Sequence, residues 1–261
     1  MKYLLAPGNW QKIAKKISRA PLVILYLDYD GTLTPIRRHP RLARLSTQTK
    51  KILRSLSQSK RVKICIVSGR SLAEIKKMVG LKNLTYVGNH GLEIEWDGRL
   101  VTLPDAGKIK IRLKQTCRKL TPLSKHYPGF WVENKGLTAS LHYRLVNRKR
   151  IRSLEKEVRQ QLKKHLTGFR LTSGKKVWEI RPRTNRDKGW AVKFLSGKFR
   201  AINKLQIYIG DDTTDLDAMK VVNKMGGISV LVGNTRTNLK NIYRVKSSGE
   251  VSTFLKNIGV I

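Results

Sequence analysis

Five short apolar runs set the strongest constraint on what this chain can fold into. Each run is rich in β-branched side chains and is followed by a polar loop; the runs are Leu22–Leu27, Val62–Val67, Leu84–Val87, Leu205–Ile209 and Ile228–Val232. Such runs are typical of parallel strands buried on both faces. Helical patterns lie between them, at Ser46–Ser57, Ser71–Val79 and Thr214–Val222. The alternation predicts an α/β fold with a Rossmann-like, doubly wound parallel sheet.

This alternation changes in the middle of the chain. There the pattern indicates two consecutive helix–strand–strand units, made of Lys108–Leu120, Phe130–Asn134, Thr138–Tyr143, Arg150–Leu166, Phe169–Thr172 and Lys176–Ile180. Glycine-containing turns at 134–136 and 173–175 suit hairpins between the strands. We therefore expect residues 107–184 to form an α+β (αββαββ) domain, inserted into a core built from residues 1–106 and 185–261.

Positive charge is the most unusual feature of the composition. The 261 residues carry 55 Lys+Arg against 17 Asp+Glu, a formal net charge of +38. The 78 residues of the expected insert hold 22 Lys+Arg and 4 Glu, a net +18, and the remaining +20 is spread over 183 residues. Such a balance attracts polyanions through long-range steering and counterion release. Nonspecific polyanion contact and a surface merely coated in cations both fit this charge.

Cysteine usage and the length of the apolar runs bear on the compartment. Cys65 and Cys117 form no CxxC pair, and Cys65 falls inside an apolar run, which predicts a buried, reduced thiol. No run approaches the roughly 20 apolar residues of a membrane span. Residues 1–7 also lack the apolar region of roughly 7–15 residues that a secretory signal needs. These features favour a reducing, cytoplasmic setting.

Two aspartates follow the first apolar run. Asp28 and Asp30 stand two positions apart at the carboxyl end of the expected strand, and Gly31 permits a sharp turn after them. Ligands of open α/β sheets bind at this edge. One carboxylate can attack phosphorus to form an aspartyl-phosphate, and the second can act as general acid and base. An Asp- and Gly-rich turn without chemistry is the alternative.

Two further motifs stand at a strand end and at a helix start. Ser68, Gly69 and Arg70 follow the run that ends at Val67, where a hydroxyl, an amide and a helix N-terminus can hold phosphate oxygens. Lys188 opens a later helical segment, where its ammonium can neutralise a phosphoryl group and nearby carboxylates. Either motif alone is weak, because serine–glycine turns and lysines are common in this chain.

Four of the 17 acidic residues lie within seven positions after the run that ends at Ile209; they are Asp211, Asp212, Asp215 and Asp217. In so basic a chain, this concentration indicates a bound cation or a cationic partner. Mg²⁺ typically takes one or two carboxylates together with phosphate and water. Asp28 and Asp211 are the expected side-chain ligands. Asp215 and Asp217 could instead cap and charge the start of the next helix.

The order of these motifs resembles that of haloacid-dehalogenase-superfamily phosphohydrolases, over essentially the whole chain. Several strings are more specific and resemble the trehalose-6-phosphate phosphatases: Gly88-Asn89-His90-Gly91, Glu133-Asn134-Lys135-Gly136, Leu141-His142-Tyr143-Arg144, Trp178-Glu179-Ile180-Arg181-Pro182 and Gly210-Asp211-Asp212-Thr213-Thr214-Asp215. The resemblance implies a Mg²⁺-dependent phosphatase with a Rossmann-like core and an inserted cap domain.

What the resemblance implies for the core residues is specific. Asp28 would be the nucleophile and a metal ligand, and Asp30 the acid and base, with its backbone carbonyl on the metal. Asp211 would complete the metal ligands, with Asp212 and Asp215 as supporting carboxylates. The phosphoryl group would be held by Ser68, Gly69 and Lys188.

The resemblance also implies a set of sugar-binding residues. In the insert these match Glu133, Lys135, Arg144, Glu179 and one of two adjacent lysines, Lys175 or Lys176; in the core, Arg70, Asn89 and His90 are added. Glu133 and Glu179 are two of only four acids in the insert, and carboxylates accept hydrogen bonds from sugar hydroxyls. Simple cross-strand ion pairs are the alternative for these glutamates.

Three alternatives concern substrate and partners. Phosphatases of sucrose phosphate, mannosylglycerate phosphate or glucosylglycerol phosphate share the core and a related cap. A polyanion-binding protein on an inert phosphatase fold would explain the charge. Such a protein would have lost its catalytic residues, yet all five are present: Asp28, Asp30, Ser68, Lys188 and Asp211. Many relatives are joined to a trehalose-6-phosphate synthase, so the resemblance allows a separate synthase partner, which no feature of this sequence indicates.

Overall fold

The computed structural model describes residues 2–37, 39–165, 167–174 and 176–261, without the side chains of residues 164 and 165. Its described part divides into two compact units. Unit 1 comprises the chain up to Val101 together with Arg186–Ile261, and unit 2 is Thr102–Asn185. Unit 2 is thus an insertion between two segments that fold together.

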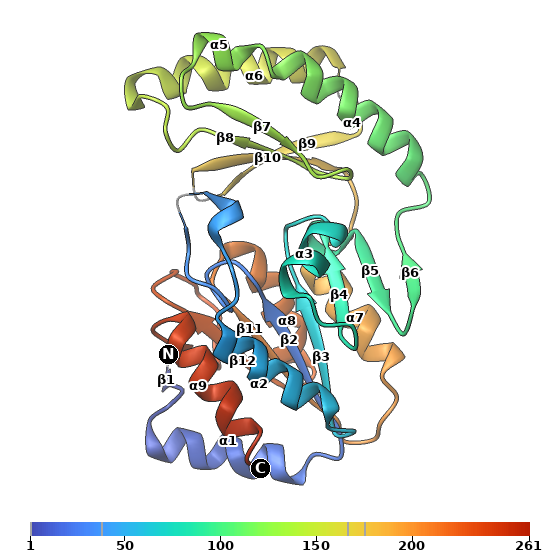
Figure 1. The fold of residues 1–261 in the computed structure, drawn as a ribbon, viewed down its shortest axis with the longest axis vertical. Coiled ribbons are helices and arrows are strands. Elements are labelled where there is room, and N and C mark those ends of the chain that lie inside the picture. The colour runs from blue at the N-terminus through green and yellow to red at the C-terminus, as the bar shows by residue number, and fades with distance from the viewer. Residues whose placement is uncertain (1, 38, 166, 175) are drawn as a thin grey trace. The chain divides into compact units, whose positions relative to one another are not determined.

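Unit 1 is built on one mixed sheet, which Figure 1 shows with helices on both faces. In the described residues its strands follow one another in the order β1 (Lys2–Tyr3), β13 (Ile242–Val245), β12 (Ile228–Val232), β11 (Leu205–Gly210), β2 (Val23–Asp28), β3 (Val62–Val67), β4 (Thr85–Gly88), β5 (Glu93–Trp96) and β6 (Arg99–Val101). All neighbours from β1 to β4 are parallel, whereas β5 and β6 are antiparallel. The five apolar runs are therefore all parallel strands, as predicted.

Buried side chains on the two faces of this sheet form two hydrophobic layers. On one face the sheet packs against α1 (Pro7–Arg19), α2 (Thr47–Gln58), α3 (Leu72–Val79) and α9 (Ser248–Ile258). On the other face it packs against α7 (Lys188–Lys198) and α8 (Leu216–Lys224). Every residue of β2 and β11 is buried, because successive side chains point into opposite layers. The central strands therefore hold their carboxyl ends rigidly.

Short elements complete unit 1. The 3₁₀ turns are η1 (Pro40–Leu42), η2 (Asn89–Gly91) and η4 (Thr213–Asp215). Ser46 and Ser71 each accept a backbone N–H at a helix N-terminus, so α2 and α3 begin one residue after these serines. Cys65 is a buried free thiol, as predicted. In the described part of the chain, no helix is both long and apolar enough to cross a bilayer.

Unit 2 is a four-stranded antiparallel sheet with helices over one face (Figure 1). The strand order is β7 (Trp131–Asn134), β8 (Ala139–His142), β10 (Val177–Pro182) and β9 (Phe169–Gly174). The helices are α4 (Ala106–Leu120), α5 (Leu123–His126) and α6 (Ile151–His165), with the 3₁₀ turn η3 (Arg148–Arg150) before α6. Its core is built from α4, α6 and alternate strand residues such as Leu141 and Trp178. The predicted αββαββ order is confirmed.

Candidate active site

A buried ion cluster lies where β2 and β11 end. Asp28 is the last residue of β2, and its Oδ1 accepts a hydrogen bond from Lys188 Nζ at 2.8 Å. The same ammonium donates to Asp215 Oδ1 at 2.7 Å. Lys188 is the first residue of α7, which the N-cap residue Asp187 fixes by accepting Trp190 N–H at 2.7 Å. Residues 160 positions apart are thus brought into one contact.

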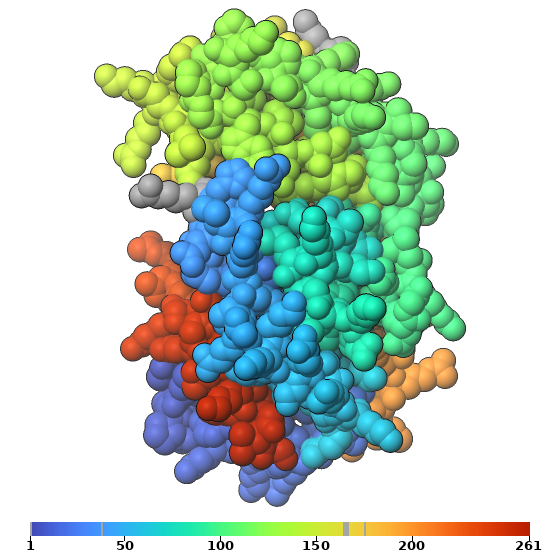
Figure 2. Space-filling view, in the orientation of Figure 1, coloured from blue at the N-terminus to red at the C-terminus, as the bar shows by residue number. Residues whose placement is uncertain are grey.

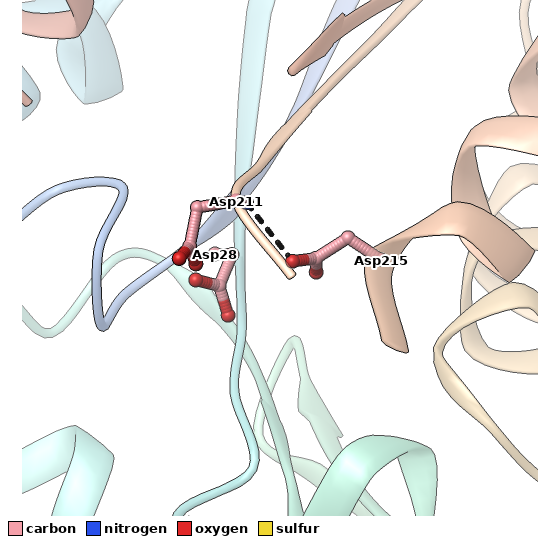
Figure 3. Close-up of side chains that lie close together, drawn as sticks. All are labelled: Asp28, Asp211 and Asp215. Carbon is pink, nitrogen blue, oxygen red and sulfur yellow. Dashed lines mark hydrogen bonds between the residues drawn. The ribbon is translucent and has the colours of Figure 1, made fainter. Parts of the chain in front are cut away.

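Asp211 joins this cluster directly after β11. One carboxylate oxygen each from Asp28, Asp211 and Asp215 lies within 4.8 Å of the others, and all three residues are buried (Figure 3). Asp215 Oδ2 accepts the backbone N–H groups of Asp211 and Asp212, at 3.0 and 2.9 Å. Asp215 therefore orients the start of the loop that carries Asp211.

The turn after β2 lies against the Asp211 carboxylate. Gly31 has a φ of +89°, and a Cβ built there would stand 2.4 Å from Asp211 Oδ2. No side chain fits this position, so the sharp turn predicted at Gly31 also creates room for the acidic cluster.

Burial and charge act together in the cluster. Burial raises the pKa of the Asp28 carboxyl well above its usual range; Lys188 opposes this rise, and Asp215 and Asp211 add to it. Burial lowers the pKa of Lys188, but the Asp215 and Asp28 carboxylates outweigh it, so the net pKa is raised. Lys188 donates to two of the three carboxylates, Asp28 and Asp215. Oxygen-rich ligand sets such as these three carboxylates suit Mg²⁺.

Tyr208 is a member of the cluster that the sequence did not indicate. It is fully buried in β11, and its hydroxyl donates to Asp215 Oδ1 at 2.6 Å. The same carboxylate oxygen thus accepts from both Tyr208 and Lys188. The available signal was a polar-tipped aromatic residue within a mostly apolar strand, two positions before Gly210.

The Asp30 carboxylate is held by a guanidinium. Arg70 donates from Nε to Asp30 Oδ2 and from Nη2 to Asp30 Oδ1, both at 2.7 Å. Arg70 also pairs with Glu74 and donates to the Pro40 carbonyl at 2.8 Å. Its side chain is 5% exposed. Arg70, which was predicted to bind substrate, therefore pairs with Asp30 in the structure. Glu74 belongs to the same group of ion pairs, and the sequence did not indicate it.

Ser68 and Gly69 follow β3, the strand beside β2. Ser68 Oγ accepts the Arg70 backbone N–H at 3.2 Å, and Ser68 O accepts the His90 backbone N–H at 2.9 Å. A Cβ at Gly69 would stand 2.5 Å from the His90 ring, so glycine lets this imidazole pack on the backbone. Asn89 donates to Glu93 Oε2 at 2.6 Å.

Two of the remaining predicted acids have structural partners. Asp212 caps η4, because its Oδ1 accepts the Thr213 N–H at 2.7 Å. Asp217 lies on the exposed side of α8 and pairs with Lys220 at 3.2 Å. The cluster that could hold a metal in the described residues therefore contains neither of them, nor the Asp30 side chain.

Unit 2 has a polar row on the sheet face opposite its helices. The register places Glu133, Ser140 and Glu179 side by side on three neighbouring strands. Glu179 Oε1 contacts Lys135 Nζ at 3.4 Å and Ser140 Oγ at 3.3 Å.

Glu133 and His142 form a second pair on this face, with 2.8 Å between Glu133 Oε2 and His142 Nε2. The His142 ring stacks on Trp131, with 3.7 Å between ring centroids. Arg144 and Lys176 are exposed, and Lys175 lies outside the described residues. Both predicted glutamates thus have a charged or titratable partner, as the ion-pair alternative expects.

Comparisons with known proteins agree on one family. The family model described as "Trehalose-phosphatase" matches residues 26–248. The Oryza sativa subsp. japonica protein "Probable trehalose-phosphate phosphatase 4" is 34% identical over 261 residues, covering 97% of this chain and 70% of its own. The Arabidopsis thaliana protein "Probable trehalose-phosphate phosphatase I" is 34% identical over 256 residues, covering 92% and 68%.

A solved structure shares the fold. The C-terminal domain of C. albicans trehalose-6-phosphate phosphatase superimposes with a TM-score of 0.81 and 23% identity, covering 97% of each chain. This likeness confirms the predicted fold class, a Rossmann-like α/β core with an inserted α+β domain.

Proposed function

This chain belongs to the trehalose-phosphatase family, and from that premise we propose that it hydrolyses trehalose 6-phosphate to trehalose and inorganic phosphate. The observation that carries the proposal is the buried contact of Asp28 with Lys188, beside Asp211 and Asp215, at the carboxyl edge of the sheet. Catalytic residues of open α/β folds belong at this edge.

In the proposed reaction, an Asp28 carboxylate oxygen attacks phosphorus while the bond to the sugar oxygen breaks. Asp30 donates a proton to that leaving oxygen, which releases trehalose. Asp30 then accepts a proton from the water that attacks the aspartyl-phosphate, which frees phosphate and restores Asp28. Lys188 already donates to Asp28 and would neutralise the phosphoryl oxygens, with Ser68 and the Gly69 N–H as further donors.

Asp30 must change partners for this role. Both of its oxygens accept from Arg70, so its carboxyl has to leave at least one of these bonds before it can transfer a proton. Its side chain is 42% exposed, which leaves room for such a rotation. We assign Arg70 the part of orienting Asp30 within this proposal.

The acidic residues fit a bound Mg²⁺. Asp28, Asp211 and Asp215 offer three buried carboxylates with oxygens within 4.8 Å of one another, and Gly31 makes room for the Asp211 oxygens. When bound, Mg²⁺ would neutralise phosphoryl charge and so reduce its repulsion of the Asp28 carboxylate. Asp28 and Asp211 would hold it, with the Asp30 carbonyl, and Asp212 and Asp215 would support them.

Sugar recognition is proposed for the polar face of the unit 2 sheet. Glu133 and Glu179 can accept sugar hydroxyls, and Lys135, Arg144 and Lys176 can donate to sugar or phosphate oxygens. Asn89 and His90 are proposed as core contributors. The cytoplasm is the compartment that this proposal assigns, because both cysteines are buried free thiols.

Phosphate release from trehalose 6-phosphate, with Mg²⁺ or with EDTA, tests the proposal. We expect phosphate release in the presence of Mg²⁺ and none in the presence of EDTA. Asp28→Asn should abolish phosphate release, because the amide that replaces the carboxylate cannot attack phosphorus. Asp217→Asn is the matched control, since it removes an exposed carboxylate from the same acidic segment and should keep activity. A panel with sucrose, mannosylglycerate and glucosylglycerol phosphates tests the sugar. Substantial activity of Asp28→Asn would refute the assigned nucleophile.

A further inference from the structure

The helical layer of unit 2 carries a dense positive charge, and the proposed chemistry uses none of its residues. Residues 106–120 and 148–165 contain 14 of the 55 Lys+Arg but only two of the 17 acids, Glu155 and Glu157. Both glutamates are engaged: Glu155 pairs with Arg159 at 2.7 Å, and Glu157 accepts from the Tyr127 hydroxyl. Both carboxylates of these segments therefore already have partners, and most of the cations are not neutralised within the segments.

Several of these cations form stripes on the solvent side of the helices. Leu113 and Cys117 of α4 and Leu154 and Val158 of α6 face the sheet, and α4 packs beside α6. Lys110, Lys114 and Arg118 repeat every four residues along α4, and Arg152 and Lys156 do so along α6; all five are exposed. Figure 2, which draws this part of the chain in green to yellow, shows long side chains projecting from its surface.

Ion pairs do not hold these stripes in place. Among the described residues, none of Lys110, Lys114, Arg118, Arg152 and Lys156 pairs with a carboxylate. Like charges four residues apart destabilise a helix. Other cations of the layer do serve the fold: Arg150 stacks on Tyr127 at 4.9 Å and Arg112 donates to the Thr167 carbonyl. Carboxylates of the described residues therefore leave these five exposed cations available to an anionic partner.

We propose that this face, named the α4–α6 face, binds the phosphate backbone of double-stranded nucleic acid without sequence preference. The helices are 15 residues each, about 22 Å long, a length over which a duplex presents roughly 13 phosphate charges. Neutralising phosphates releases counterions, which supplies the free energy of such binding.

The residue composition of α4 and α6 favours a duplex over single-stranded nucleic acid and over an anionic membrane. Neither helix contains an aromatic residue, so the face has no platform on which single-stranded bases could stack. Interfacial helices insert an apolar side into lipid, but the apolar sides of α4 and α6 are used by the unit 2 core. We therefore do not propose binding to an anionic membrane, and the test below includes lipid vesicles to check for it.

The test measures fluorescence anisotropy of a labelled 20-base-pair DNA duplex with the full chain, over a series of salt concentrations. The face variant carries Lys110→Glu, Lys114→Glu, Arg152→Glu and Lys156→Glu. The matched control carries Lys12→Glu, Lys15→Glu, Lys16→Glu and Arg19→Glu, which reverse four exposed charges of α1 in unit 1. Both change net charge equally, and none of the eight positions belongs to the proposed catalytic or sugar-binding residues.

We expect the wild type to bind with a steep salt dependence and the face variant to bind at least tenfold more weakly. The slope of log K against log salt should fall by roughly 0.9 for each phosphate that the protein no longer neutralises, and by much less in the control. Equal weakening in both variants would mean that binding follows net charge alone, and would overturn the proposal. So would binding to phosphatidylserine vesicles but not to the duplex.

Measuring trehalose-6-phosphate hydrolysis by both variants tests the proposed function independently of duplex binding. Retained turnover shows that the face variant is folded. If the wild type lacks turnover, the proposed function fails, while circular dichroism of the two variants still reports their folding and the duplex result stands by itself.

Discussion

Tyr208 is the single residue whose contribution to the ion cluster can be isolated most cleanly. Its hydroxyl donates to the same Asp215 oxygen that accepts from Lys188, so it limits how that carboxylate can rotate. A hydrogen bond to a charged group contributes roughly 1.5–3 kcal/mol, and about 1.4 kcal/mol corresponds to tenfold in rate. We predict that Tyr208→Phe lowers kcat for trehalose 6-phosphate roughly tenfold and changes KM little.

Tyr26 provides the matched control for this change. It is equally buried and stacks on Tyr208, with 6.5 Å between ring centroids, but its hydroxyl donates to Gln206 at 3.2 Å instead of to an acid. Tyr26→Phe should therefore leave kcat near the wild-type value. Equal losses of kcat in both variants would show that packing, and not the bond to Asp215, is what matters.

The residues differ in how far the sequence could predict them. Asp28 and Asp211 each follow an apolar run, so a parallel sheet alone brings their strand ends together. The contact between Tyr208 and Asp215 depends instead on which way one strand residue faces and where η4 turns. The Arg70–Asp30 pair likewise depends on rotamers, and a lone arginine has no signal against 55 cationic residues.

Helix α7 links a local capping interaction to the chemistry, because Lys188 is its first residue. The Asp187 carboxylate caps the helix through the Trp190 N–H. Replacing an N-cap aspartate by alanine costs about 1 kcal/mol. We predict that Asp187→Ala lowers the free energy of unfolding in urea by that amount and also lowers kcat several-fold, because the start of the helix and its lysine become less fixed.

Ser46→Ala is the corresponding change at a helix remote from the cluster. Ser46 caps α2 by accepting the Thr49 N–H at 3.0 Å, so the two variants lose similar stability. Only Asp187→Ala should lose turnover. If Ser46→Ala lowers kcat as much, the effect reflects global stability and not the position of Lys188.

The central strands and the main unit 2 elements were predicted, whereas the helices α1 and α9 and three short strands, β1, β5 and β6, were not. The five buried runs gave the central strands, and the helical patterns from Ser46 and Ser71 gave the starts of α2 and α3 to within one residue. Strand β1 has only two residues, both exposed, so no periodicity could reveal it. The β5–β6 hairpin lies at the sheet edge with mostly partly exposed residues. Tertiary pairing alone makes β1 a strand, whereas the β5–β6 hairpin had a local signal that the sequence analysis missed: Asp97-Gly98, both at positive φ, is a two-residue hairpin turn.

The acidic cluster affects the whole molecule, because its charges are buried with the fold. Without a bound cation, burial raises the pKa of Asp28 above its ordinary value of 3.8. The folded chain then binds this proton more tightly than the unfolded chain does, so stability falls as the pH rises above about 4 through the raised pKa. Neutral pH is therefore where a cation at this cluster should stabilise the protein most.

We predict that Mg²⁺ raises the thermal unfolding midpoint at pH 7 and raises it much less at pH 5, where protons compete for the carboxylates. A ligand at a hundred times its Kd stabilises by about 2.7 kcal/mol, which corresponds to roughly 5–10 °C for a chain of this size. Scanning calorimetry with and without Mg²⁺ measures the shift. Asp211→Asn should remove most of it, whereas Asp217→Asn should retain it, since that carboxylate is exposed and paired with Lys220. A shift that survives Asp211→Asn, or that is equal at both pH values, would place the ion outside this cluster.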